Sequence, residues 1–160
     1  MRTKAFRVAI GIAVAIALAG VTVAGIRLFS DGPVAMLPGG PMSGQLASGS
    51  FPGFEQPPGG LIELQVEGWR PSSRTVIGFL HEGNLYVPAV RAESKMWPER
   101  VLANSNVIVR HRGDLYERRA RRVTDSELIS RLREAAPDTG RLTPEMFVAD
   151  TTWYFRLDPR

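Results

Sequence analysis

The chain has 160 residues, of which 44% are hydrophobic and 22% are charged, and its formal net charge at pH 7 is +4. It contains no cysteine, which excludes disulfide bonds, thiolate nucleophiles and cysteine-based metal sites. The chain has only two histidines, His81 and His111, and no cysteine, which is a poor ligand set, so we expect no protein-bound metal. No helix-turn-helix, zinc-finger or RNA-recognition pattern is present, so we expect no nucleic-acid partner.

An uncharged stretch, residues 8–26, follows three basic residues at the N-terminus. As a helix rising about 1.5 Å per residue it would cross most of a hydrocarbon core of roughly 30 Å, and it has no polar face. Only Arg27 follows before Arg70, so the positive-inside rule places residues 1–7 in the cytoplasm. We therefore expect a single-pass membrane protein with an extracytoplasmic domain. The alternative is a cleaved signal peptide, which exports the domain equally.

The rest of the chain divides into a linker, residues 27–44, and one folded domain, residues 45–160. Residues 30–60 are rich in Gly, Pro and Ser, a composition typical of a flexible linker that lifts a domain off a membrane. They also contain several large apolar residues, more than a pure linker needs. We therefore expect residues 44–48 to pack on the domain as a first strand.

Alternation of polar and apolar residues, typical of a half-buried strand, recurs along the domain. It is clearest where Ile62, Leu64 and Val66 share one face. With the turn residues between them, such patterns predict strands at residues 61–67, 75–81, 85–91, 106–112, 115–123 and 152–157.

Helix signals are fewer. Pro98 suits a first helical turn and predicts a short helix at residues 97–104. Thr124 opens a capping box, and the apolar stripe that follows predicts a helix ending at Pro137. Another short helix is expected to open at residues 143–145. Because closure removes exposed sheet edges, we expect a mostly β (α+β) fold: a six-stranded antiparallel split β-barrel with a few short helices, preceded by one transmembrane helix.

Two polar loops, residues 68–74 and 91–97, are the candidate binding sites. They combine cations and hydroxyls with a turn or a helix start, and these are the groups that hold phosphate. The alternative is that they are ordinary turn residues and surface charges. The residues concerned are Arg70, Ser72 and Arg74 in the first loop, and Ser94, Lys95 and Trp97 in the second.

Four arginines stand close together on the predicted strand 115–123, at positions 118, 119, 121 and 122. The simplest interpretation is a solvated strand. The alternative is an anionic partner, such as a membrane surface or a phosphate-bearing cofactor.

The stretch 97–107, WPERVLANSNV, resembles the Trp and Leu-x-Ala-Asn-Pro-x-Val run of flavin reductase-like split β-barrel proteins. The deazaflavin-dependent nitroreductase family is the most similar branch, and the upstream PGGPMSG at 38–44 resembles an element of an uncharacterised, membrane-anchored bacterial branch. Residues 112–116, RGDLY, and 153–157, WYFRL, also fit the family. The resemblance implies flavin mononucleotide or a deazaflavin coenzyme, its phosphate tail held by Arg70, Ser72, Arg74, Ser94, Lys95 and Trp97.

Two functions stay open. The first is a flavin- or deazaflavin-dependent oxidoreductase of unknown substrate, in which hydride chemistry belongs to the cofactor and no catalytic side chain stands out. Tyr86 and Tyr116 could donate protons in it, although strand tyrosines are more often packing residues. The second is a non-catalytic envelope module that binds a lipid, a quinone-like molecule or a partner protein. A homodimer is compatible with either, because split barrels commonly pair across a sheet face.

Overall fold

The computed structural model describes residues 2–35, 37–55, 58–137 and 151–160. Within the N-terminal helix it describes the side chains of residues 10–22, 24 and 25. The helix predicted at residues 143–145 lies outside the described residues.

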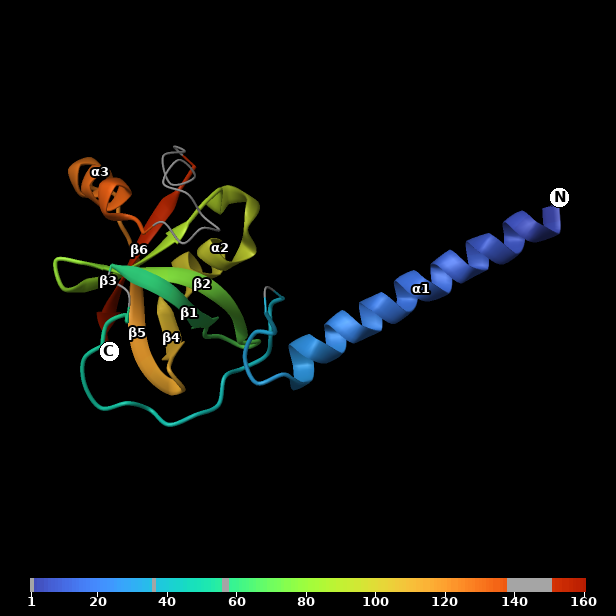
Figure 1. Cartoon of the computed structure of the whole chain (residues 1–160), viewed down its shortest axis with the longest axis horizontal. Helices are drawn as coiled ribbons and strands as arrows, with labels where there is room; N and C mark the ends of the chain where they lie inside the picture. The colour runs from blue at the N-terminus through green and yellow to red at the C-terminus, as the bar shows by residue number, and fades with distance from the viewer. Residues whose placement is uncertain (1, 36, 56–57, 138–150) are drawn as a thin grey trace.

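Helix α1 comprises Arg2–Phe29 and extends away from the rest of the chain (Figure 1). Its described apolar side chains lie in solvent all around the helix, among them Ile16 and Leu18, which are 68% and 63% exposed. Among the residues whose side chains are described, no helix is both long and apolar enough to cross a membrane.

Six antiparallel strands form a closed barrel in the order β1-β2-β3-β6-β5-β4, which confirms the six-stranded antiparallel barrel predicted from the sequence. Pairing of β1 with β4, for example Glu63 opposite Arg110, closes it. The strands are β1 (Gly59–Val66), β2 (Ser72–His81), β3 (Asn84–Ala89), β4 (Asn106–His111), β5 (Asp114–Arg122) and β6 (Trp153–Pro159).

The first strand expected at residues 44–48 does not form. Leu46 makes one isolated parallel bridge to Leu115, supported by Ala47 N donating to Leu115 O at 2.8 Å. Glycines with positive φ at positions 44 and 49 bend the backbone out of the extended conformation on both sides, so the segment packs on β5 without joining the sheet.

Two hydrophobic layers hold the domain together. Inward side chains of the barrel strands pack around Phe155, and Trp97 and Val101 of α2 (Met96–Ala103) join the same cluster. A second cluster lies where α3 (Ser126–Ala135) contacts the barrel, and in it Leu132 packs with Tyr154, Phe79 and Tyr86. Each layer excludes water from aromatic rings, so burial of apolar area is the main stabilising term.

The cap of α3 differs from the prediction. Asp125, not Thr124, is the N-cap, and its Oδ1 accepts from Leu128 N at 2.7 Å. A carboxylate also stabilises the positive end of the helix dipole, which a hydroxyl at the preceding residue cannot do as well.

Three of the four arginines of β5 are exposed, as a solvated strand predicts, and Arg118 is the exception. Arg118 is only 4% exposed and lies above the Tyr116 ring, at 5.5 Å from its centroid. Arg121 Nε donates to Asp158 Oδ2 at 2.8 Å, and Arg122 stacks 3.7 Å above the Trp153 ring. Three of the four cations are therefore engaged within the domain, which weakens the case for an anionic partner on this strand.

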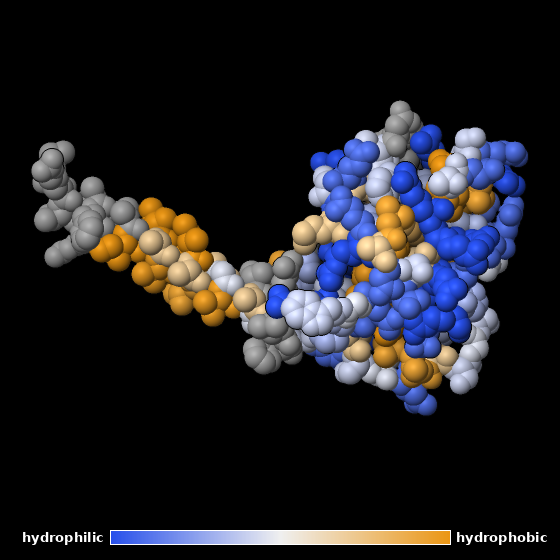
Figure 2. All heavy atoms as spheres, turned by 180° about the vertical axis from the view of Figure 1, so that it is seen from behind, coloured by the Kyte–Doolittle hydropathy of each residue, from blue (hydrophilic) through white to orange (hydrophobic). Residues whose placement is uncertain are grey.

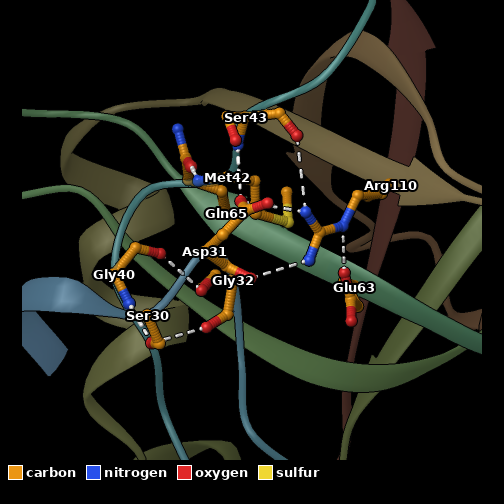
Figure 3. Close-up of polar contacts among 10 residues, drawn as sticks. Ser30, Asp31, Gly32, Gly40, Met42, Ser43, Glu63, Gln65 and Arg110 are labelled. Carbon is orange, nitrogen blue, oxygen red and sulfur yellow. Dashed lines mark hydrogen bonds and ion pairs between the residues drawn. The ribbon is translucent and has the colours of Figure 1, made fainter. Parts of the chain in front are cut away.

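Residues 30–35 and 37–43, which we call the strap, lie between α1 and the barrel and are bonded to the barrel (Figure 3). Arg110 of β4 donates to Asp31 Oδ1 and Asp31 O, each at 3.0 Å, and its Nε bonds Glu63 of β1. Ser43 N donates to Asp31 Oδ1 at 2.7 Å, and Met42 N donates to Gln65 Oε1 at 2.5 Å. Most of the predicted linker, residues 27–44, is thus held against the barrel surface.

Gly39 fixes the middle of the strap. It forms an antiparallel bridge with Ser73 of β2, with N···O distances of 3.0 and 3.2 Å, and the buried Ser73 hydroxyl donates to Gly40 O at 2.6 Å. A Cβ at position 39 would lie 1.7 Å from Gly32 O, so only glycine allows this close approach of two backbone segments.

Candidate functional site

A pocket of about 750 Å³ lies where the strap, the β1–β2 connection, α2 and the end of α1 meet. Its size is within the range of pockets that hold cofactors and other small molecules. Three arginines line it, and none of its described lining residues is acidic. The lining residues are Ala24, Pro38, Gly39, Pro41, Trp69, Arg70, Pro71, Ser72, Arg74, Met96, Trp97 and Arg100.

Arg100 holds two other lining residues of this basic pocket in place through hydrogen bonds. Its Nη1 donates to Ser72 Oγ at 2.7 Å and its Nη2 donates to Arg70 O at 2.6 Å. The guanidinium therefore ties α2 to the loop that follows β1, and two of its donors are used within the protein. Arg100 fixes the position of Arg70 and Ser72, while its charge adds to the positive field of the pocket.

The two other arginines lie beside tryptophan rings. The Arg70 guanidinium carbon is 4.4 Å from the centroid of Trp69, and that of Arg74 is 5.9 Å from the centroid of Trp97. Trp69 is 87% exposed, whereas Trp97 is buried in the barrel core. Cation–π contact orients each guanidinium relative to the tryptophan ring beside it.

The structure brings four of the six predicted site residues together. Arg70, Ser72, Arg74 and Trp97 line the pocket. Ser72 and Arg74 belong to β2 and pair with Val66 and Leu64, so the first loop is shorter than the sequence indicated.

Ser94 and Lys95 do not line the pocket. The Ser94 hydroxyl donates to Arg91 O at 2.8 Å and so caps the short 3₁₀ turn η1 (Ala92–Ser94). Burial lowers the pKa of Lys95, and the charges of Arg74 and Arg91 lower it further. Lys95 is therefore close enough to Arg74 for their charges to interact, although it does not line the pocket.

Sequence analysis missed Arg100 and the strap. Arg100 follows Trp97 by three residues, which places both on one face of α2, and this spacing was the available signal. For Pro38, Gly39 and Pro41 the only signal was their resemblance to a family element, because nothing local shows that a Gly- and Pro-rich segment lies against a strand.

The tyrosines considered as proton donors lie elsewhere. Tyr86 is buried under α3 with Phe79, and burial raises its pKa. Tyr116 belongs to the barrel core beside Phe51, with ring centroids 5.5 Å apart. Neither lines the basic pocket, so both are packing residues.

A second, smaller cavity of about 300 Å³ lies between β1, β2 and the β4–β5 turn. Its main polar groups, Glu63 and Arg110, already bond each other and hold the strap. Burial lowers the pKa of His111 at its edge, and the charge of Arg112 acts in the same direction. This cavity is part of the strap attachment.

No protein-family model and no curated protein matches the sequence. Among solved structures, a NimC/NimA family protein from Clostridium acetobutylicum is 18% identical, with a TM-score of 0.47; the match covers 61% of this chain and 73% of that protein. A protein from Listeria innocua named "Putative Pyridoxamine 5'-phosphate oxidase" is 20% identical, with a TM-score of 0.43; the match covers 62% and 83%. Similarity at this level establishes neither a family nor an activity.

Proposed function

We propose that the domain binds a phosphorylated aromatic cofactor of the flavin or deazaflavin type in the basic pocket, and that it serves as a membrane-anchored oxidoreductase of the deazaflavin-dependent nitroreductase kind. The observation that carries the proposal is the lining of one pocket by three arginines and an exposed tryptophan without a carboxylate.

The donor set fits such a molecule. Arg70 and Arg74 present guanidinium groups, which bind phosphate with paired N–H donors. Arg100 holds Arg70 and Ser72 in place through its two hydrogen bonds. Trp69 supplies an exposed ring on which an aromatic system can stack. The cofactor would supply the hydride chemistry, and the protein would supply binding, orientation and charge.

The membrane anchor is the second part of the proposal. It is supported by the uncharged sequence of residues 8–26 and by the exposure of the apolar side chains described in α1. Those described side chains cover fewer residues than the roughly 20 that a span requires, so the sequence is the stronger argument. The basic N-terminus favours a barrel outside the cytoplasm.

Titration of the full chain in detergent with flavin mononucleotide and with a deazaflavin coenzyme tests cofactor binding. Arg74→Gln should weaken binding roughly tenfold to a hundredfold, because it removes a charge-assisted hydrogen bond to phosphate. Arg119→Gln, the same change at an exposed position of β5, is the matched control and should bind as the parent does. Equal affinities of all three proteins would refute the site.

A non-catalytic binding module on the same pocket is the second candidate. It is favoured by the absence, among the described lining residues, of any Asp, Glu, His, Lys or Tyr that could move a proton. The test is whether the bound, reduced cofactor passes its electrons to nitroaromatic or quinone acceptors. If the protein binds the cofactor but these acceptors never reoxidise it, the non-catalytic alternative is favoured.

A further inference from the structure

Large apolar and basic side chains lie exposed at the mouth of the basic pocket, which is formed by Trp69, Arg70 and Met96. Trp69 is 87% exposed and Met96 is 65% exposed, and Arg70 is exposed beside them. Trp69 and Met96 line the same pocket, so with Arg70 they form one exposed surface that is both apolar and basic.

The mouth lies next to α1. Ala24 of that helix lines the same pocket as Trp69 and Met96, although these residues are far apart in the sequence. Figure 2 shows apolar side chains on the visible face of the described part of α1. Because Ala24 belongs to the uncharged run 8–26, the pocket mouth lies level with the last part of that run.

We propose that the surface formed by Trp69, Arg70 and Met96 rests on the headgroup region of an anionic lipid bilayer. This proposal depends on the proposed membrane anchor but not on the cofactor. Tryptophan is favoured at membrane interfaces because its ring is apolar and its N–H is polar, and a flexible methionine adds apolar contact. Arg70, with Arg74 and Arg100 behind it and no acidic residue among the described lining residues, selects anionic headgroups over neutral ones.

Tryptophan quenching by brominated lipid tests the contact, because α1 contains no tryptophan and the chain has only Trp69, Trp97 and Trp153. The full chain is reconstituted into vesicles of brominated phosphatidylcholine with phosphatidylglycerol, and flotation establishes that it is inserted. Trp69→Phe should remove most of the quenching. Trp153→Phe is the matched control and should leave it, because Arg122 covers that ring.

Charge selectivity is tested by omitting phosphatidylglycerol. Quenching should then decrease, and Arg70→Gln should lower quenching in anionic vesicles to the level seen in neutral ones. Arg119→Gln is the matched control and should leave quenching in anionic vesicles at the level of the parent protein. Quenching that is unchanged by Trp69→Phe, or equal in anionic and neutral vesicles, would overturn the proposal. Failure to float would overturn the anchor and this surface together, whereas flavin binding in detergent is judged separately.

Discussion

Replacement of Gly39 by alanine tests whether the strap is part of the folded domain. The new Cβ would meet Gly32 O at 1.7 Å and the Gly32 carbonyl carbon at 2.3 Å, both backbone atoms that no rotamer change can move. The strap must therefore leave β2. Two backbone hydrogen bonds with Ser73 and the bond from its hydroxyl to Gly40 would be lost. At about 1 kcal/mol each, the free energy of unfolding should fall by roughly 3 kcal/mol.

Urea denaturation of the full chain in detergent, followed by tryptophan fluorescence, measures this loss. For a domain of this size the midpoint should move down by roughly 2 M urea. Gly20→Ala in α1, where a Cβ meets nothing within 4 Å, is the matched control and should leave the midpoint unchanged. A Gly39→Ala midpoint equal to that of the parent would refute the argument that the strap stabilises the barrel.

Three further predictions concern single groups. The Ser43 backbone N–H, aided by the charge of Arg110, holds the pKa of Asp31 below its usual 3.8, so the stabilisation that Asp31 itself contributes should be complete above about pH 5 and be lost as the pH falls below about 4; Asp31→Asn should remove this part of the pH dependence in urea melts. Burial raises the pKa of Tyr154 to about 12, so stability should fall as the pH rises from about 10 to 12, and Tyr154→Phe should remove that fall. Asp125→Ala should cost about 1 kcal/mol by removing the α3 cap, whereas a cost of that size in Thr124→Ala instead would contradict the cap assignment.

The barrel was predictable because a half-buried strand requires polar and apolar residues to alternate along the local sequence. Alternating burial in β1, with Ile62 and Leu64 inside, is visible in the sequence and matches the structure. The start of β2 was not predictable in the same way. Ser72 and Arg74 are polar and look like loop residues, yet they pair with β1 because tertiary contact overrides local preference.

The site was predictable only in part, for a related reason. Arg70 and Arg74 stand out as cations in a polar stretch. The residues that complete the pocket come from α1, the strap and α2, and their approach depends on pairs such as Gly39 with Ser73, which are 34 positions apart. Lys95 has the right chemistry and the right neighbours in sequence, but it is not among the residues that line the pocket.

The early attachment of the strap also limits how far the barrel can lie from the end of α1. The end-to-end distance of a flexible chain grows with the square root of its length. A free linker of about 30 residues would therefore allow the barrel to lie roughly 30 Å from the end of the helix. Here α1 ends at Phe29 and Asp31 is already bonded to Arg110. Only Ser30 stands between them, so the strap keeps the barrel next to the end of α1, and Pro38 and Gly39 of the same strap line the pocket.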